Sequence, residues 1–559
     1  MAMARTALAL LVAGVAACGG GADRQAGGAG ADADGDGAGS GHPTFTGAPA
    51  GGTLVVLAEG EPDMLNPLVW ESNMAYQVVH LMFRALGRRD STLVNYEPDL
   101  LERWEQPDER TVLLHVRPGV NWHDGRPVTA EDVVFTIERQ GEEATASTRA
   151  GDVAAVESVR MVDSTRVEVR LARTGPAAVN ALLEVVPVPK HLLDTVPAER
   201  LRFAAFNERP VGNGLFRFVS WQKGQQLTVE ANPDVPEGRP SLDRIIVRLV
   251  PEPTGRLTEL LNGSGDLAKI SADQRQQAES ARGVRVETAA QVRPGWIAFN
   301  ASRAPVSDPR VRRAFLMAID RNAIVKGLMG PQAEPALSPI PPALGGQGEG
   351  VRPIPFDLDQ AGRLLDEAGW RDSNGDGIRD QGGRPLRIEV EYSTADPVRQ
   401  DLLVAMQAQL RRAGIDLVPR GMERTTWVER LRNQQFTASF WGWGWGPGVM
   451  GPNAEMVFHS RSAPPNGPNF AGYSNPQADA LIDRILAETD EGRAEQLWRQ
   501  LEQILVDDAV YAPIFLDPEF YAVNERFGNV RMRGPEWWED VIYWHVPENR
   551  RLPRDRARQ

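Results

Sequence analysis

Short runs of hydrophobic residues, alternating or continuous, are spread along the chain and predict β-strands. Successive side chains of a strand point to opposite faces, so a half-buried strand alternates apolar and polar positions. β-branched residues are frequent in these runs, as is typical of strands. The runs are TLVVLA (53–58), TVLLHV (111–116), TRVEVRL (165–171), LFRFV (215–219), RIIVRLV (244–250) and RIEVEY (387–392).

Longer segments between these runs place apolar residues three and four positions apart, which predicts helices. Four helix starts carry capping residues, namely Thr129 (in a capping box with Asp132), Asp308, Asp357 and Asn475. Gly369 provides a stop for the helix that begins after Asp357. We find no internal repeat, and we predict a fold that mixes helices and strands throughout.

Tryptophan and glycine alternate in one stretch, FWGWGWG, at residues 440–446. Glycines would weaken a helix here, whereas an extended strand would place Trp441, Trp443 and Trp445 on one face. Two interpretations follow. The strand is a core strand with a buried aromatic face, or it is the ring-lined wall of a ligand cleft, with glycines that let another backbone come close.

The N-terminus resembles an export signal. One positive charge (Arg5) precedes a short apolar run that ends in small residues, which predicts a signal peptide at residues 1–17. Cys18 follows Val-Ala-Ala, which is similar to the lipobox of bacterial lipoproteins, so we predict that Cys18 carries lipid. The alternative is an ordinary cleavage site with an incidental cysteine.

Residues 18–50 are mostly Gly, Ala and Asp and predict a flexible tether. Cys18 is the only cysteine among 559 residues, so no disulfide can form within the chain. A net charge of -14 argues against a nucleic-acid partner. The remaining length predicts two or three domains.

Several segments, read in order, resemble the extracellular solute-binding proteins of family five, which are the peptide-, nickel- and opine-binding receptors of ABC importers. The strongest is YEPDLLERWEQPDERTVLLHVRPGVNWHDGRPVTAEDVVFTI at residues 96–137. Others are VGNGLFRFVSW (211–221), WIAFNASRAPVSDPRVRRAFLMAIDR (296–321), FAGYSNPQADALID (470–483) and LEQILVDDAVYAPIF (501–515). The resemblance runs from about Gly52 to near Asp540.

The resemblance implies a periplasmic-binding-protein-like α/β fold of the type II, or cluster C, architecture. Two α/β lobes would be joined by a two-stranded hinge and accompanied by an extra domain. Lobe I would comprise residues 51–71, 207–290 and 521–559, the extra domain residues 72–206, and lobe II residues 291–520. A ligand would lie between the lobes and be enclosed when they close.

The resemblance also implies ligand contacts. It places the tryptophan stretch in lobe II facing the cleft, so Trp441, Trp443 and Trp445 are expected to stack on the solute. The turn after the first strand would supply Trp70, Glu71 and Asn73. For Glu71 the alternative is an exposed acid at a helix start.

The sequence departs from the peptide-binding members at one point. Those members have a carboxylate shortly after the aromatic residue, where it meets the amine of the peptide. Here the first acid after Trp441 is Glu455. A peptide would therefore need another counter-charge, such as Glu71, because a buried ammonium without one is costly.

Residues 372–380, DSNGDGIRD, place Asp372, Asn374, Asp376 and Asp380 as in the first part of a calcium-binding loop. Position twelve is Gly383, where a bidentate glutamate would complete the coordination. We favour a solvated Asp/Gly turn, and a weak structural calcium site is the alternative. No other cofactor is expected.

We therefore expect a non-enzymatic, lipid-anchored and monomeric protein outside the cytoplasm that delivers an oligopeptide-like solute to an ABC permease. Oligosaccharide binding is an alternative within the family, because indole faces also suit sugar rings. A secreted glycosidase that uses paired carboxylates and a ligand sensor are alternatives of other classes. The G-x-S-x-G and H-E-x-x-H motifs are absent.

Overall fold

The computed structural model describes most of the chain beyond residue 49. The described residues are 50–90, 95–172, 175–289, 293–330, 333–342, 346, 348, 350–443, 450–488, 490–516, 519–532 and 537–556. All of them belong to one compact unit, Pro43–Gln559. The predicted signal peptide, Cys18, nearly all of the tether and Trp445 lie outside the described residues.

The first and last parts of the described chain meet in a seven-stranded sheet, in the order β12-β20-β11-β1-β10-β9-β8. Its strands are β1 (Thr53–Ala58), β8 (Phe216–Gln222), β9 (Gln226–Ala231), β10 (Arg244–Leu249), β11 (Leu267–Ile270), β12 (Val284–Thr288) and β20 (Phe520–Asn524). β1 is buried at every position and runs parallel to both neighbours, β10 and β11. This explains why its sequence is continuously apolar from Leu54 to Ala58.

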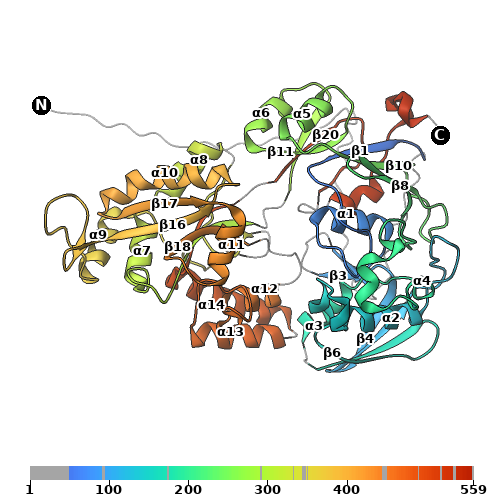
Figure 1. Ribbon diagram of the computed structural model, residues 1–559, viewed down its shortest axis with the longest axis horizontal. Coiled ribbons are helices and arrows are strands. Elements are labelled where there is room, and N and C mark those ends of the chain that lie inside the picture. Colours follow the sequence, from blue (N-terminus) through green and yellow to red (C-terminus); the bar gives the residue numbers. More distant parts are fainter. Residues whose placement is uncertain are drawn as a thin grey trace, which may run out of the picture. The chain divides into compact units, whose positions relative to one another are not determined.

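A second, five-stranded sheet has the order β17-β16-β18-β13-β19. Its strands are β13 (Pro294–Phe299), β16 (Arg387–Ser393), β17 (Asp416–Met422), β18 (Ala438–Gly442) and β19 (Tyr511–Leu516). Alternate residues of β13 serve two separate hydrophobic clusters, with Ile297 and Phe299 in one and Trp296 and Ala298 in the other. The sheet is therefore covered on both faces (Figure 1).

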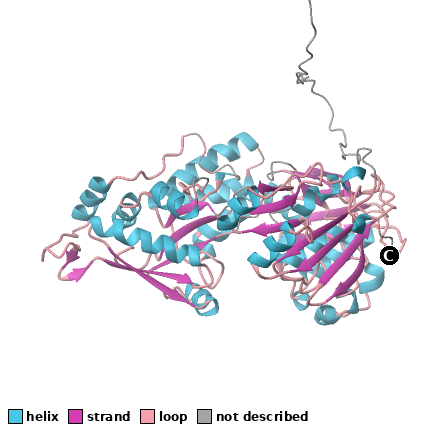
Figure 2. Ribbon diagram, turned by 90° about the horizontal axis from the view of Figure 1, so that it is seen from above, coloured by secondary structure: helices cyan, strands magenta, loops and turns pink. Residues whose placement is uncertain are grey.

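Helices contribute residues to both clusters. Figure 2 shows that helices and strands are mixed throughout the described chain. The first cluster includes residues of α7 (Pro309–Met317), α8 (Arg321–Met329), α9 (Leu358–Glu367) and α10 (Pro397–Arg412). The second includes residues of α11 (Arg424–Arg432), α12 (Met450–Phe458), α13 (Pro476–Ala487) and α14 (Glu491–Asp508).

A third, four-stranded sheet has the order β4-β5-β7-β6. Its strands are β4 (Leu101–Asp108), β5 (Thr111–Val116), β6 (Val156–Met161) and β7 (Arg166–Leu171), and its neighbours in sequence are α2 (Ala130–Gly141), α3 (Pro176–Leu183) and α4 (Lys190–Leu193). One hydrophobic cluster contains residues of this sheet, of the seven-stranded sheet, of α1 (Asn73–Met82) and of α15 (Trp537–Asp540). These two parts of the chain therefore share a core.

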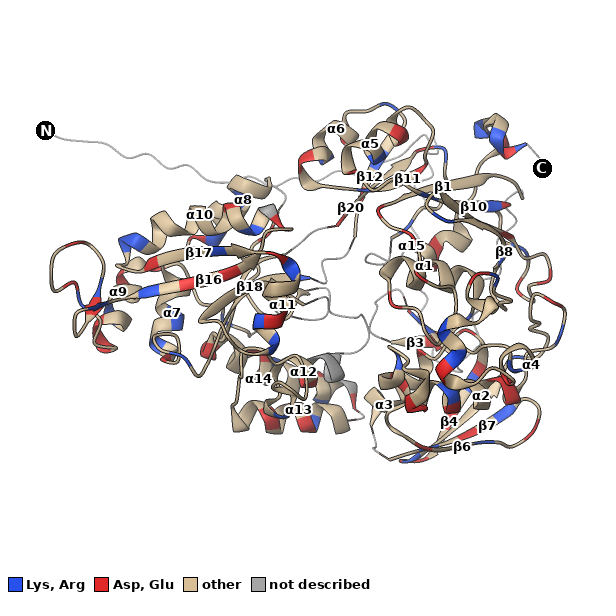
Figure 3. Cartoon of the chain, viewed as in Figure 1, with Lys and Arg blue, Asp and Glu red and all other residues tan. Residues whose placement is uncertain are grey.

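The remaining elements are short. A cluster on the other face of the seven-stranded sheet includes residues of α5 (Pro253–Leu261) and α6 (Arg275–Glu279). Two small hairpins pair β2 (Gly87–Arg89) with β3 (Tyr96–Pro98) and β14 (Asp380–Gln381) with β15 (Arg384–Pro385). Lys and Arg residues are interspersed with Asp and Glu residues along the elements (Figure 3).

The elements predicted from local patterns are confirmed. All six strand-like runs are strands, with ends that differ by at most a few residues. Asp308, Asp357 and Asn475 accept backbone hydrogen bonds as N-caps, and Thr129 forms the capping box with Asp132. None of the six predicted runs corresponds to strand β4, because its sequence, LERWEQPD, is mostly polar and exposed.

Two segments pass between the seven-stranded and the five-stranded sheet, from β12 to β13 and from β19 to β20. Thr288 pairs with Phe520 where they leave the first sheet, and Pro294 pairs with Leu516 where they enter the second. Both pairings are antiparallel. The chain thus passes twice between the two sheets, as the resemblance implies, and we call residues 289–293 and 517–519 the crossing segments.

The turn before α2 holds a half-buried histidine in one tautomer. His123 Nε2 lies 3.1 Å from the carbonyl oxygen of Gly214, and Nδ1 lies 3.2 Å from the backbone N of Gly212. Nε2–H therefore donates and Nδ1 accepts, which only a neutral ring can do. Burial lowers the pKa of His123 to about 4.

This environment predicts a pH-dependent stability. In the unfolded chain the histidine binds a proton below about pH 6.5, whereas in the folded protein it stays neutral down to about pH 4. The free energy of unfolding should therefore fall as the pH is lowered through this window, by up to about 1.4 kcal/mol per pH unit from this residue. Urea unfolding at several pH values, with His123→Gln alongside, measures the effect. An equal slope in both proteins would contradict it.

Candidate functional site

The register of the strands places two predicted ligand-binding segments at equivalent edges of the two large sheets. β1 runs parallel to β11, so Ala58 lies toward the end of β11 where Ile270 pairs with Phe520. β18 runs antiparallel to β13, and Gly442 pairs with Gly295, the second residue of β13. Both β1 and β18 therefore end at the edge from which the crossing segments leave. In open α/β sheets, ligands bind at carboxyl-terminal strand ends.

Trp441 lies in the core of the five-stranded sheet. Its side chain is only 4% exposed, and its ring is 5.7 Å from that of Trp296 in an edge-on arrangement. Phe470 and Tyr511 also contact it, with ring centroids 5.3 and 6.4 Å away. For Trp441, the interpretation as part of a core strand with a buried aromatic face is therefore correct.

Trp443 follows the end of β18 and is half-buried. Its ring centroid is 6.1 Å from that of Trp441, so the expected placement on one face is confirmed for these two residues. At Gly442 an added Cβ would lie 2.6 Å from the carbonyl oxygen of Pro294. The expected close approach of another backbone is therefore confirmed here, and Trp443 is the half-buried residue of the two described tryptophans in this stretch.

The second predicted segment lies just before α1. Trp70 is half-buried, with its ring 5.4 Å from that of Tyr76, and its carbonyl accepts a hydrogen bond from Thr148. Asn73, the first residue of α1, is exposed. Trp70 packs against the cluster of the seven-stranded sheet and Trp443 against a cluster of the five-stranded sheet. The structure thus assigns the two segments to different sheets.

Glu71 forms an ion pair that its sequence context does not predict. Its carboxylate contacts Arg202, and the two side chains are 55% and 33% exposed. Its backbone N donates to Asp63, whose pKa is lowered by such hydrogen bonds although burial opposes the shift. Because exposed ion pairs contribute only about 0–1 kcal/mol, Glu71 can exchange Arg202 for another cation at small cost.

A cavity of about 410 Å³ lies between residues around α3 and residues of α12 and α13. Its volume is in the range of small-ligand sites. One wall is formed by Arg110 and small residues, and the opposite wall includes Glu455, Arg461 and Asp483. Arg461 Nε lies 3.0 Å from the carboxylate of Glu455. The first acid after the tryptophan stretch is therefore already paired with an arginine.

A group of charged residues that local sequence patterns do not predict lies at the crossing edge of the seven-stranded sheet. Glu519 lies 2.8 Å from Lys269 and 3.7 Å from Arg293, and it accepts a hydrogen bond from Tyr521. Glu59, the first residue after β1, is also exposed here. These charged residues all lie at or next to the end of a strand. Which strand ends are neighbours depends on the pairing of the strands, so no single segment of sequence reveals the group.

The candidate calcium ligands are Asp372, Asn374, Asp376 and Asp380. The carboxylate of Asp372 accepts hydrogen bonds from the backbone N of Gly375 and Gly377, and Asp380 accepts from Ser373. These contacts form a hydrogen-bonded turn of the kind that we favoured. Within the described ranges, no three His, Cys, Asp or Glu side chains are grouped so that they could hold a metal ion.

None of the helices that the structure describes combines the length and the apolar character needed to cross a membrane.

The chain matches known proteins over most of its length. Residues 95–464 match the profile of the bacterial extracellular solute-binding proteins, family 5. It is 29% identical to the oligopeptide-binding protein AppA of Bacillus subtilis, over 85% of this chain and 88% of that protein. It is 25% identical to heme-binding protein A of Haemophilus influenzae, over 77% of this chain and 80% of the relative.

Solved structures share the fold. The structure of AppA from Bacillus subtilis in complex with a nonapeptide superimposes with a TM-score of 0.74 at 27% identity, covering 89% of this chain and 99% of that one. NikZ from Campylobacter jejuni in complex with Ni(L-His) gives a TM-score of 0.75 at 23% identity, covering 90% and 100%. The mixed α/β fold is therefore that of the cluster C solute-binding proteins. The chain belongs to family 5 of the bacterial extracellular solute-binding proteins, the non-catalytic binding components of ABC transporters.

Proposed function

We propose that the protein captures an oligopeptide-like solute between the crossing edges of its two large sheets and delivers it to an ABC permease. The observation that carries this proposal is the shared edge, because β1 and β18 both end where the crossing segments leave. AppA, which this chain resembles over most of its length, is named for oligopeptide binding.

We also propose the domain division, with residues 51–71, 207–290 and 521–559 as lobe I, 72–206 as the extra domain and 291–520 as lobe II. The three large sheets draw their strands from these respective ranges, apart from one residue of β20. Domain closure would then change the angle between the two large sheets, between which the chain passes twice. Lipidation of Cys18 would hold this monomeric receptor at the outer face of a membrane.

Trp443 and Glu71 are the proposed solute contacts. Trp443 offers a partly accessible indole face, and Trp441 supports it from the core. Glu71 would receive the ammonium group of a peptide by releasing Arg202. Trp70 and Asn73 would flank Glu71.

An oligosaccharide is the second candidate solute. The observation that favours it is the ion pair of Glu455 with Arg461. Because its charge is already balanced, Glu455 does not provide a counter-charge for the amine of a peptide. Indole faces stack equally well on sugar rings, which need no counter-charge.

Native mass spectrometry tests the proposal. The protein is purified without denaturation, and the mass of any retained solute is measured before and after mild unfolding. Masses that fragment into amino acids would support a peptide solute, and hexose-spaced masses would support an oligosaccharide. Release of a solute of neither kind would contradict both candidates.

Replacing Trp443 by Ala should weaken binding of the identified solute about ten- to hundredfold, as expected for an aromatic residue at the centre of a site. Isothermal titration calorimetry measures the affinity. Trp104→Ala is the matched control, because Trp104 is also half-buried but lies in β4 of the four-stranded sheet. Equal affinities for the Trp443 variant and the control would refute the stacking role.

A further inference from the structure

Glu519 occupies a distinctive position on the second crossing segment. It directly precedes β20, and its carbonyl oxygen accepts a hydrogen bond of 2.9 Å from the backbone N of Ala289 on the first crossing segment. This bond continues the ladder between β12 and β20 by one residue pair. The backbone of Glu519 is therefore fixed to the seven-stranded sheet.

The carboxylate of Glu519 connects three parts of the chain. It lies 2.8 Å from Nζ of Lys269 in β11 and accepts a hydrogen bond of 3.1 Å from the hydroxyl of Tyr521 in β20. It also lies 3.7 Å from Nη1 of Arg293. Arg293 directly precedes β13, a strand of the five-stranded sheet. One carboxylate thus reaches from the first sheet to the start of the second.

The two sides of this contact differ in strength. The Glu519 side chain is only 11% exposed, and its contact with Lys269 is short, so this side is firm. Arg293 is 49% exposed and its contact is long, so this side is weak and can open. Burial alone would raise the pKa of Glu519, but the ion pairs with Lys269 and Arg293 keep it below its usual value.

We propose that Glu519 acts as a clasp between the crossing segments and restricts the angles that the two large sheets adopt before a solute binds. Glu519 would be a positioning residue, because it affects the angle between the two large sheets and need not touch the solute. The inference rests on the proposed closure of two lobes. A narrower range of angles lowers the conformational cost of forming the bound state.

The test measures the distance between the lobes in solute-free protein. The full chain carries Cys18→Ser and two spin-labelled cysteines, Gln277→Cys on α6 and Ala408→Cys on α10, which are exposed positions. Double electron–electron resonance then gives the distance distribution. With Arg293→Gln, the population outside the main distance peak should rise about two- to fivefold, as expected for the loss of one exposed ion pair.

Three further variants separate a clasp from a general structural role. Glu519→Gln should broaden the distribution at least as much as Arg293→Gln, and the double variant should broaden it no further than Glu519→Gln alone. Glu287→Gln is the matched control, since this acid pairs with Arg285 of its own strand, β12. It should leave the distribution unchanged.

Arg293→Gln changes a half-exposed side chain and should leave the urea midpoint unaltered, so it remains informative if Glu519→Gln is unstable. Distributions of Arg293→Gln and Glu519→Gln that superimpose on the unsubstituted protein would overturn the proposal, as would additive effects in the double variant. Since no solute is present, these outcomes are independent of the solute found by mass spectrometry. A peptide receptor without a clasp is thereby distinguished from a protein of another function.

Discussion

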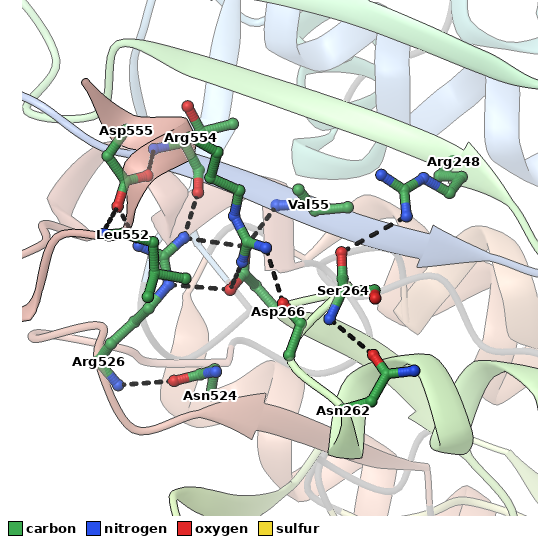
Figure 4. Close-up of polar contacts among 12 residues, drawn as sticks. Val55, Arg248, Asn262, Ser264, Asp266, Asn524, Arg526, Leu552, Arg554 and Asp555 are labelled. Atoms are coloured by element: carbon green, nitrogen blue, oxygen red, sulfur yellow. Dashed lines mark hydrogen bonds and ion pairs between the residues drawn. The ribbon is translucent and has the colours of Figure 1, made fainter. Parts of the chain in front are cut away.

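Replacing Asp266 by Asn is expected to lower the free energy of unfolding by about 3–5 kcal/mol, the range for breaking a buried ion pair. Asp266 is fully buried. Its carboxylate accepts hydrogen bonds from Nε and Nη2 of Arg526, from Nη2 of Arg554 and from the backbone N of Val55 (Figure 4). Asn keeps the shape but removes the charge that compensates both arginines.

The loss should be large because Asp266 connects distant parts of the chain. Arg526 is also buried and bonds to the carbonyl oxygen of Thr53 and to Asp555, while Asp555 accepts from the backbone N of Thr53. One network therefore holds together β1, Asp266 directly before β11, and the C-terminal residues (Figure 4).

Urea unfolding followed by circular dichroism measures this loss. Glu230→Gln is the control, because Glu230 forms an ion pair with Arg217 in the same sheet but is 42% exposed. Its loss should cost about 0–1 kcal/mol. If the Asp266 variant were no less stable than the control variant, the network would have no net stabilising role.

Replacing Trp441 by Ala is expected to destabilise the protein by about 3–5 kcal/mol, because it removes a large buried side chain and leaves a cavity. Its ring packs against Trp296 of β13 and Tyr511 of β19, so two neighbouring segments of the sheet would lose contacts. Thermal and urea unfolding measure the change.

Trp443→Ala is the matched variant, two residues away in the same stretch. It should cost less stability than Trp441→Ala, because Trp443 is already partly exposed. Loss of solute binding in Trp443→Ala together with a nearly intact free energy of unfolding would separate the two roles. Equal destabilisation by both substitutions would show that both rings serve the core, and it would remove Trp443 from the proposed site.

The elements that sequence analysis identified correctly depend on interactions within a few residues. An N-cap such as Asp308 bonds to a backbone N two residues away, and Gly369 ends its helix because its own backbone adopts a φ of +84°. The periodicity of side chains along a strand is likewise local. These features were predictable because no distant part of the chain is needed to form them.

The candidate site was predictable only in part. Alternation placed Trp441 and Trp443 on one face, but the burial of Trp441 depends on Trp296, which reaches it through the pairing of β13 with β18. The partner of Glu71 is Arg202, far away in sequence. The alternation of side chains along a strand determines on which face of the sheet a residue lies. The side chains that it contacts there depend on which strands pair.

Local sequence patterns were enough to predict six strands, four helix starts and, through the order of the motifs, the solute-binding family. Which charged side chains meet depends on the tertiary fold. Lys269, Arg293 and Glu519 come from three separate segments and converge because β11, β12 and β20 pair side by side. Ion pairs of this kind act over a few ångströms in space and leave no periodic pattern in the chain, so folding must bring the partners together before they can be recognised.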